Sequence, residues 1–593
     1  MTDRRFSAPD LARRLLAPIA ALLGLVVGLS VLILPSPAPT TADPTTFSAE
    51  RAMASINRLA DEPHSVLRRE AHDRARDDVI SMFANLGYTA NVHSDPLFDF
   101  SIPEDKETFD MLSTEQQAAV KDATADTIVV DVPGKSERTM ALMAHYDSAT
   151  VEGTENDEQS YSSGTSHGAA DDGYGVAAII ETLRAIKAEG RQPENSLKIV
   201  ITDGEEIGLV GARNEMRHHR ADYENVDLVL NLEARGTSGP ALMFETSPNN
   251  SAVAGYFLSH VKQPVTGSLL PSLYARMPNT TDMAKVIPEG FTVLNIAAIG
   301  EADHYHHATD APRYVNHSTL QHYGDQVLDL TRAWAFDGQT PTLTANGDLH
   351  FFQLWRGMTV SYPATVGTGL GCLAIIAALG VVVVRARSLR WKRVLGTVWG
   401  LTWRAASVSA AAGLVQLGAM AMKWAPETGI GPNPLLPWMF AGGALIGAGL
   451  TAHFVVRRWK EGLGQETLAA VLLLLAAACV PLMVLLPGAA YVLVLPTLTL
   501  ALTALAPQRV RPVVGALAAF IMVVIFAPTV LLIHELLSLS AVWVTVFFAI
   551  VPVAPLALVL LQAGSRRTAR GAGTASGAAH NSTPVVGQVA ATV

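Results

Sequence analysis

The sequence contains very little cysteine and little charge for its length. Its 593 residues include two cysteines, Cys372 and Cys479, and both lie in long apolar runs. The polar part of the chain can therefore form no internal disulfide, and cysteine usage does not fix the redox compartment. Charged residues make up 16% of the chain and hydrophobic residues 49%. This composition is too apolar for a wholly soluble protein and too charged for a wholly embedded one, which indicates a chain of mixed character.

The sequence also lacks a basic excess and internal repeats. Its 43 lysines and arginines are outnumbered by 53 acidic residues, which gives a net charge of -10. Nucleic-acid binding requires a basic face, so the balance argues against a nucleic-acid partner. Peptide and lipid partners remain open, and nothing in the composition predicts an oligomeric state.

The first long apolar run covers residues 15–34 and is long enough to cross a bilayer. A cleaved signal peptide is the alternative, but the run is long for a signal core and lacks a sharp cleavage pattern. We therefore expect residues 1–14 to be a cytoplasmic N-terminus and residues 15–34 to be an uncleaved anchor.

The second apolar region covers residues 361–562 and predicts a membrane domain of about seven helices. The expected spans are 362–384, 405–422, 437–456, 466–487, 489–506, 513–533 and 540–562. Basic residues cluster in alternate connections, as at residues 385–393 and 457–460. With the N-terminal arginines inside, eight spans satisfy the positive-inside rule at every crossing. Both termini are then cytoplasmic, the tail 563–593 is disordered, and the domain between the two apolar regions is extracytoplasmic (outside the cell or lumenal).

Residues 45–350 are polar and turn-rich, and predicted strands alternate with predicted helices. The expected strands are 127–132, 139–144, 197–202, 227–232, 241–245 and 291–299, and the expected helices are 68–86, 176–188 and 318–336. This alternation predicts an α/β three-layer sandwich with a mixed, largely parallel sheet. The acidic and Ser/Gly-rich stretch 151–166 shows no periodicity and predicts a mobile surface loop.

Acidic and imidazole side chains follow several of these strands. His145 and Asp147 follow one strand, although such a pair alone is more often an ordinary surface pair. In a metal site, His145 would bind the ion and Asp147 would accept a hydrogen bond from its imidazole. Asp171 and Asp172 precede a helix, where Asp is also a favoured cap. One carboxylate can bridge two ions because each oxygen binds one of them, which makes Asp171 a candidate bridging ligand.

Two adjacent glutamates, Glu205 and Glu206, follow the next strand. Neighbouring carboxylates in a turn repel each other, and a cation or a raised pKa on one of them relieves that repulsion. We predict that Glu206 is a metal ligand. We predict that Glu205 is the general base, which takes a proton from water and passes it to the leaving amine.

Two further fragments complete the set. Glu233 ends another strand, and a buried salt bridge with Arg235 is an equally good interpretation of that pair. Residues 303–310 read DHYHHATD, and spacing does not decide which histidine binds a metal. Because the carboxyl ends of such strands lie at one edge of a sheet, five donor-bearing fragments predict a two-metal site there. Imidazole and carboxylate donors suit zinc, with manganese or cobalt as alternatives.

At these residues the sequence resembles the co-catalytic zinc aminopeptidases of metallopeptidase family 28. It is most similar to the membrane-bound branch that includes vacuolar and endoplasmic-reticulum membrane peptidases, over about residues 50–340. The resemblance implies that His145 and Glu233 bind one zinc ion, that Glu206 and His306 bind the other, and that Asp171 binds both. It also implies the fold of a zinc peptidase.

The resemblance further selects among the histidines and assigns roles. His306 is chosen because it follows Tyr305 and precedes Asp310 by four residues, as in the family. Glu205 is implied to be the base, and the Asp171–Asp172 peptide bond to be cis. Two departures are His307, which replaces a usual Thr, and a missing Gly-Ser in the entry segment that begins at residue 61.

The motifs and the resemblance together predict a membrane-anchored di-zinc aminopeptidase with two Zn²⁺ per chain. A hydroxide bridging the ions would hydrolyse N-terminal peptide bonds. Arg235 and Tyr305 are candidate contacts to the substrate, although each could equally be a packing residue. Carboxypeptidase, aminoacylase and glutaminyl cyclase chemistry on the same scaffold are alternatives, and a cyclase would be expected to keep one metal.

A transporter or scaffold with a regulatory peptidase-like domain is the alternative from a different class. It predicts several buried charges within the spans. The spans hold few such residues, namely His453, His534 and Glu535. The spans therefore favour an anchor over a transport pathway.

Overall fold

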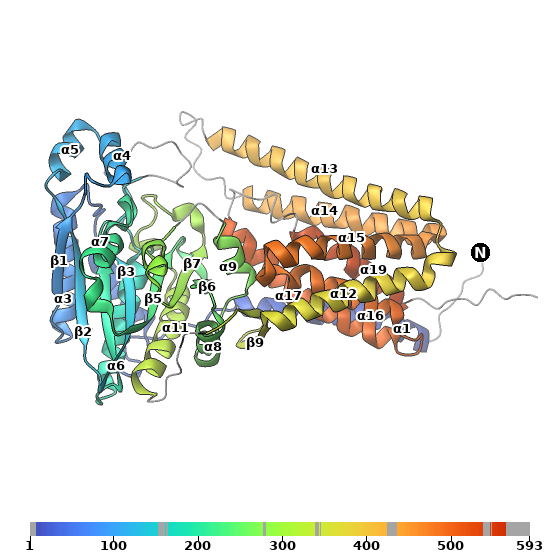
Figure 1. Cartoon of the computed structure of the whole chain (residues 1–593), viewed down its shortest axis with the longest axis horizontal. Coiled ribbons are helices and arrows are strands. Elements are labelled where there is room, and N and C mark those ends of the chain that lie inside the picture. Colours follow the sequence, from blue (N-terminus) through green and yellow to red (C-terminus); the bar gives the residue numbers. More distant parts are fainter. Residues whose placement is uncertain are drawn as a thin grey trace, which may run out of the picture.

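The computed structural model describes residues 8–151, 161, 164–276, 280–337, 343, 345–423, 436–537, 546 and 548–564, with side chains undescribed at 8–10, 415–423 and 436–445. Three parts of the sequence prediction lie outside these residues. They are nearly all of the expected tail 563–593, the N-terminal arginines Arg4 and Arg5, and most of the expected loop 151–166. A sheet-based domain and a bundle of long helices lie end to end along the longest axis of the molecule (Figure 1).

The sheet-based domain is built on seven strands in the order β1-β2-β4-β3-β5-β7-β6. They are β1 (Asn91–Pro96), β2 (Thr124–Val132), β3 (Ser136–His145), β4 (Asn195–Thr202), β5 (Val226–Ala234), β6 (Ser238–Thr246) and β7 (Val293–Gly300). The four central strands β4, β3, β5 and β7 are parallel. The outer strands β1, β2 and β6 pair antiparallel. The carboxyl ends of the central four therefore lie at one edge of the sheet.

Helices cover both faces of this sheet. Successive residues of β3 alternate between the two apolar layers, since Met140 and Leu142 belong to one buried cluster and Ala141 and Met143 to the other. The first layer is formed by α2 (Ala49–Leu59), α3 (Arg69–Asn85), α6 (Gly173–Ala188), α8 (Ser251–His260) and α11 (His317–Phe336). The second is formed by α7 (Val210–His218) and α10 (Met283–Val286). This arrangement confirms the α/β sandwich with a mixed sheet and a parallel centre.

All six strands and three helices that the sequence predicts are present within a few residues of their expected bounds. The sequence did not predict β1, whose residues NVHSDP are polar and mostly exposed and so show no apolar alternation. It also did not predict the hairpin of β8 (Leu349–Trp355) and β9 (Met358–Pro363), which crosses the expected domain boundary near 350–361.

The helical part contains α1 (Ala8–Leu29), α12 (Ala364–Arg385), α13 (Trp391–Lys423), α14 (Leu436–Arg458), α15 (Gly464–Leu485), α16 (Tyr491–Leu505), α17 (Arg511–Leu537) and α19 (Val553–Gly564). Each helix falls on one of the eight expected spans. Among the described residues, five stretches are long and apolar enough to cross a membrane. One of them, Ile446–Leu485, joins α14 and α15 across a break at Gly462, whose φ is +77°. The number of crossings stays a prediction.

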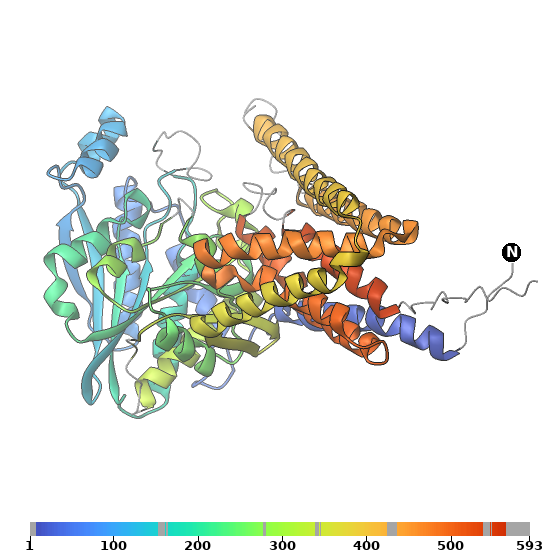
Figure 2. The ribbon, with the colours of Figure 1, turned by 45° about the vertical axis from the view of Figure 1, so that its right-hand side comes forward.

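The N-terminal helix packs closely into this bundle. α1 lies along α17 (Figure 2). A Cβ atom added at Gly24 or Gly28 would come within 2.8 Å or 2.6 Å of a backbone oxygen of α17. Two small residues four apart let two helix backbones approach this closely, which is a common way for membrane helices to associate.

Candidate metal centre

The predicted ligands come together at the carboxyl edge of the parallel strands. His145 is the last residue of β3, and Glu233 lies near the end of β5. Glu206 lies in a short 3₁₀ turn after β4, and His306 lies in the loop after β7. Asp171 arrives from the segment that leads into α6. Five fragments that are far apart in the sequence thus meet at one place, as expected for an open α/β sheet.

Three of these side chains form a first group. The Nε2 atom of His145 lies 3.3 Å from Oδ1 of Asp171 and 3.9 Å from Oε2 of Glu233. One donor atom from each of the three residues lies within 4.8 Å of the others. All three residues are buried, so the group is a candidate site for one cation.

The second group shares Asp171 with the first. The Nε2 atom of His306 lies 3.3 Å from Oδ2 of Asp171 and 3.0 Å from Oε1 of Glu206. The two oxygens of Asp171 therefore face two different histidines, Oδ1 toward His145 and Oδ2 toward His306. Glu205 also lies close, since its carboxylate, Glu206 and His145 form a third group of donors within 4.8 Å.

The residues present fit a pair of divalent cations. Oδ2 of Asp171, Oε1 of Glu206 and both ring nitrogens of His306 are buried and have no hydrogen-bond partner among the described residues. Buried polar atoms are almost always paired, so several unpaired ones close together, such as Nε2 of His306 and the two carboxylate oxygens, are explained by an ion or a ligand. Imidazole nitrogens with carboxylate oxygens are donors that zinc accepts.

Aspartates around the two groups orient the ligands. Asp147 accepts hydrogen bonds from the backbone amides of Glu205 (3.1 Å) and Glu206 (3.2 Å), and so fixes the turn that carries them. Its carboxylate was expected to hold His145. The nearer acceptor for Nδ1 of His145 is the backbone carbonyl of Asp147 at 3.0 Å, whereas the carboxylate is 3.5 Å away.

Two other aspartates act on the segment that carries the shared ligand. Asp172 caps α6 by accepting from the amide of Gly175 at 3.0 Å, and the Asp171–Asp172 peptide bond is cis, as the resemblance implied. Asp310 accepts from the amides of Ala170 at 2.7 Å and Asp171 at 3.3 Å. These bonds set the position of Asp171 from its backbone side.

Burial and the closeness of several acids set the electrostatics of the centre. Burial raises the pKa of Glu205 well above its ordinary value, and the charge of Glu233 raises it further. Burial also raises the pKa of Glu206 to about 7. Burial lowers the pKa of His306, but Glu206 and Asp171 outweigh it and raise that pKa to about 10. A bound cation would relieve the repulsion among the acids.

A pocket opens beside the two groups. Its wall includes Asp171, Glu205, Glu206 and Glu233, together with the predicted substrate contacts Arg235 and Tyr305. The Tyr305 ring stacks on the His306 ring with centroids 3.7 Å apart. The guanidinium of Arg235 lies 5.7 Å from the Tyr305 centroid. Arg235 makes no ion pair with Glu233 among those found in the described residues, so the predicted alternative of a buried salt bridge is not what places these side chains.

Sequence reasoning missed two residues that hold the centre. The hydroxyl of Tyr323 in α11 accepts from the amide of Glu233 at 2.7 Å and donates to its carbonyl at 2.9 Å. Asp282 is buried and accepts from the hydroxyl of Thr202 at 2.6 Å. Neither residue stands at a strand end or in a run of donors, so no sequence signal marked them.

A buried polar network lies behind the centre. The carboxylate of Asp203 accepts from the hydroxyl of Tyr146 at 2.9 Å and from the amide of Asp126 at 2.7 Å, and lies 3.1 Å from Nε2 of His72. Asp203 is two residues before Glu205, and Tyr146 lies between His145 and Asp147. The network therefore joins α3 to the two turns that carry the site.

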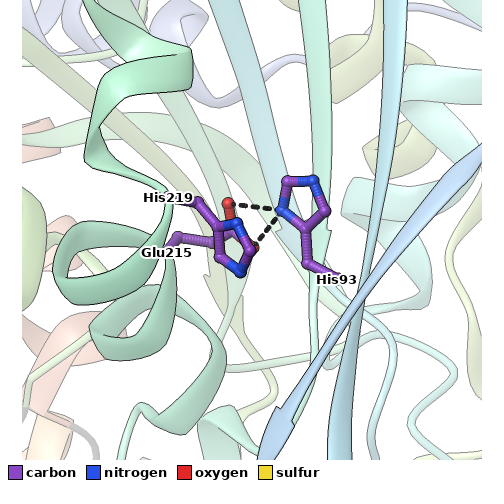
Figure 3. A group of neighbouring side chains, drawn as sticks. All are labelled: His93, Glu215 and His219. Carbon is purple, nitrogen blue, oxygen red and sulfur yellow. Dashed lines mark hydrogen bonds and ion pairs between the residues drawn. The ribbon is translucent and has the colours of Figure 1, made fainter.

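A second group of donors, His93, Glu215 and His219, lies between β1 and α7 (Figure 3). Nδ1 of His93 is 2.9 Å and 3.1 Å from the two oxygens of Glu215, and Nε2 of His219 is 2.9 Å from Asp95. The two imidazole rings are nearly parallel, with centroids 4.0 Å apart and 17° between planes. A metal ion lies in the plane of each imidazole that binds it, and rings stacked in this way cannot both meet one ion. We therefore interpret this group as hydrogen bonds that join the edge strand to α7.

Known proteins share this site region. Residues 127–331 match the model of Peptidase family M28. The vacuolar membrane protease of Lodderomyces elongisporus is 28% identical over 210 residues, which are 35% of this chain and 20% of that protein. The vacuolar membrane protease of Saccharomyces cerevisiae strain S288c is 25% identical over 340 residues, 53% of this chain and 32% of that protein. The chain thus covers less than two thirds of the length of these relatives.

Two solved structures are similar to this chain at a low level. A zinc aminopeptidase from Bacillus subtilis has 12% identity and a TM-score of 0.37, and covers 50% of this chain and 98% of its own. The glutaminyl cyclase of Porphyromonas gingivalis has 18% identity and a TM-score of 0.36, and covers 48% of this chain and 98% of its own. Likeness at this level does not distinguish between the two activities.

Proposed function

We propose a function from the premise that residues 127–331 form a domain of metallopeptidase family 28. The chain is a membrane-anchored di-zinc peptidase that removes residues from the N-terminus of peptides. The observation that carries this proposal is the pair of buried donor groups, His145–Asp171–Glu233 and Asp171–Glu206–His306, that share one carboxylate.

In this proposal His145 and Glu233 hold one zinc ion and His306 and Glu206 hold the other. Asp171 holds both ions. When bound, a pair of zinc ions polarises a carbonyl group and makes water more acidic. The chain's own contribution is to keep the donors in place. The carboxylates of Asp147 and Asp310 accept hydrogen bonds from backbone amides and so fix two of the ligand-bearing segments from outside the donor set.

Glu205 is the general base in this proposal. Its carboxylate lies among the donors but is not needed to complete either of the two groups that share Asp171. It accepts a proton from the attacking water and passes it to the leaving amine. Burial raises the pKa of Glu205 above its ordinary value, and perturbed pKa values are common among catalytic acids and bases.

The choice of an aminopeptidase over the alternatives rests on charge and on the number of donors. The acidic side chains of the pocket wall are the proposed ligands Asp171, Glu206 and Glu233 and the proposed base Glu205. An acidic wall of this kind favours a substrate with a free α-ammonium group over one with a free carboxylate. A one-metal glutaminyl cyclase would not need the complete first group of His145, Asp171 and Glu233. Both groups are complete here, which supports a two-metal peptidase.

The membrane arrangement is part of the proposal. α1 and the later helices hold the peptidase domain at a bilayer. The basic connections at 385–393 and 457–460 lie on the cytoplasmic side, and the peptidase domain lies on the other side.

The test uses the full chain purified in detergent, with hydrolysis of aminoacyl-anilides measured with and without a chelator. Glu205→Gln should retain about two zinc ions per chain and lose at least about 100-fold in kcat, since general-base catalysis contributes roughly 10²–10⁴-fold. The surface substitution Glu224→Gln is the matched control. Full turnover in Glu205→Gln would remove Glu205 from its role, and cleavage of only amine-blocked substrates would favour a carboxypeptidase or an endopeptidase.

A further inference from the structure

The wall of the pocket beside the metal centre is apolar in part. The apolar part of the wall consists of Phe244 on β6, Tyr274 on α9 (Leu269–Tyr274), and Ala297 and Ile299 on β7. The Phe244 and Tyr274 rings meet edge to face with centroids 4.7 Å apart. An apolar surface of this kind stabilises a ligand by removing apolar area from water, at roughly 25 cal/mol per Å².

The residues of this wall belong to an apolar cluster that continues into the membrane helices. Phe244, Ala297 and Ile299 belong to one buried cluster with side chains of α16 and α17. The members from these two helices are Tyr491, Val492, Ile525, Phe526, Leu532 and Ile533. The members of one buried cluster pack on one another, so the strands that form the wall pack on the membrane helices.

Polar contacts hold α9 to the turn between α15 and α16. The hydroxyl of Ser268, just before α9, donates to the carbonyl of Gly488 at 2.7 Å. The guanidinium of Arg276, just after α9, donates to the carbonyl of Leu485. The approach at Gly488 is close, because an added Cβ atom would lie 2.9 Å from the carbonyl oxygen of Ser268. The position of Tyr274 therefore depends on this turn of the membrane domain.

The end of α17 reaches the other border of the site. The carboxylate of Glu535 lies near the backbone of Glu301, which begins the loop that leads to His306. α17 also contacts β7, which carries Ala297 and Ile299. Membrane helices thus support both the apolar wall and the start of a ligand-bearing loop.

We propose that the membrane domain is a structural part of the substrate pocket rather than an anchor alone. Its α15–α16 turn and α17 hold the apolar wall of the pocket in place. A bulky apolar side chain of the substrate, next to the scissile bond, lies against this wall. Gly488 and Arg276 are positioning residues in this account, since neither touches the substrate. The inference rests on the proposed peptidase function and names the part of the chain that sets its side-chain selectivity.

The test compares hydrolysis of leucyl- and alanyl-anilides by the full chain in detergent. The variants are Gly488→Ala, which pushes the turn away from Ser268, and Arg276→Ala, which removes the bond to Leu485. Gly380→Ala in α12 is the matched control, because an added Cβ atom meets nothing within 4 Å there. One methylene in an apolar pocket is worth about 10- to 200-fold in selectivity.

We expect the wild-type chain and Gly380→Ala to prefer the leucyl substrate. Gly488→Ala and Arg276→Ala should lower the leucyl-to-alanyl ratio of kcat/KM by about tenfold, mainly through a higher KM for the leucyl substrate, with zinc content retained. An unchanged ratio in both variants would overturn the inference. If Gly488→Ala loses its zinc, the leucyl-to-alanyl ratio of the Arg276→Ala variant alone tests the inference, because Arg276 is exposed. A wild-type chain that cleaves neither substrate would contradict the proposed function itself, before any variant is compared.

Discussion

Among single residues, Asp171 matters most, because the geometry of both donor groups depends on how it is held. Its two oxygens face His145 and His306, and its backbone amide is bound by the carboxylate of Asp310. A shared ligand has little freedom, because a shift toward one ion is a shift away from the other. Residues that bind its backbone therefore affect both donor groups at once.

Asp310→Asn tests this dependence. An amide can present only one oxygen to the two backbone N–H groups that Asp310 now accepts, so one of them loses its partner. Loss of such an outer contact typically lowers metal affinity by about 10- to 100-fold. Chelator competition monitored by zinc release should show this decrease, and the exposed Asp122→Asn variant should behave as wild type. Equal zinc retention in both variants would contradict the role given to Asp310.

The sequence predicted those residues of the centre that stand in runs or at strand ends. Glu205 and Glu206 are adjacent acids, and their mutual repulsion is visible without a structure. Asp282 and Tyr323 could not be found in this way, because each is a single polar residue on an element that packing alone brings to the site. The choice of His306 among three nearby histidines came from the resemblance and not from spacing.

At the scale of elements, the centre is held by the contact between α3 and the ends of β3 and β4. His72 on α3 lies 3.1 Å from Asp203, and both side chains are buried. Burial lowers the pKa of His72, but the charge of Asp203 and their hydrogen bond outweigh it, so the pKa lies above the ordinary 6.5. Because the folded chain binds this proton more tightly than the unfolded chain, the pair stabilises the fold fully below pH 6.5. That stabilisation is lost as the pH rises through the folded pKa.

His72→Gln should therefore destabilise the chain more at pH 6 than at pH 9. Removal of one partner of a buried charged pair typically costs about 3–5 kcal/mol. Thermal unfolding of the detergent-purified chain at the two pH values measures the difference, with His260→Gln as a control outside any carboxylate pair. A loss of stability that is the same at both pH values would show that the His72 charge does not contribute.

The predictability of the elements follows their burial. β3 to β7 are buried on both faces or alternate clearly, and the sequence located all of them. β1 was missed because it is an exposed edge strand that carries His93 and Asp95 where an apolar pattern would be expected. The short α9 was also missed, since its position depends on contacts with the membrane helices rather than on its own six residues.

In the whole molecule, the apolar helices and the sheet-based domain form one structure with a shared apolar cluster. The alternation of basic connections predicts which side of the membrane each part occupies. Hydropathy located the helices, but it contains no information on their packing against the sheet domain.

Impermeant maleimide labelling of intact cells tests the sidedness. In a chain with Cys372 and Cys479 replaced by Ser, we expect a cysteine at the exposed position Glu289 to react from outside or from the lumen. A cysteine at the exposed position Arg387, in a basic connection, should react only after permeabilisation. The reverse pattern would place the peptidase domain in the cytoplasm.

Anomalous X-ray scattering at the zinc edge, from crystals of the full chain, shows whether two cations share Asp171. We expect two zinc peaks in the centre, one against His145 and Glu233 and the other against Glu206 and His306, with an oxygen of Asp171 beside each. A single peak, or zinc bound only at another group such as His93 and Glu215, would contradict this expectation.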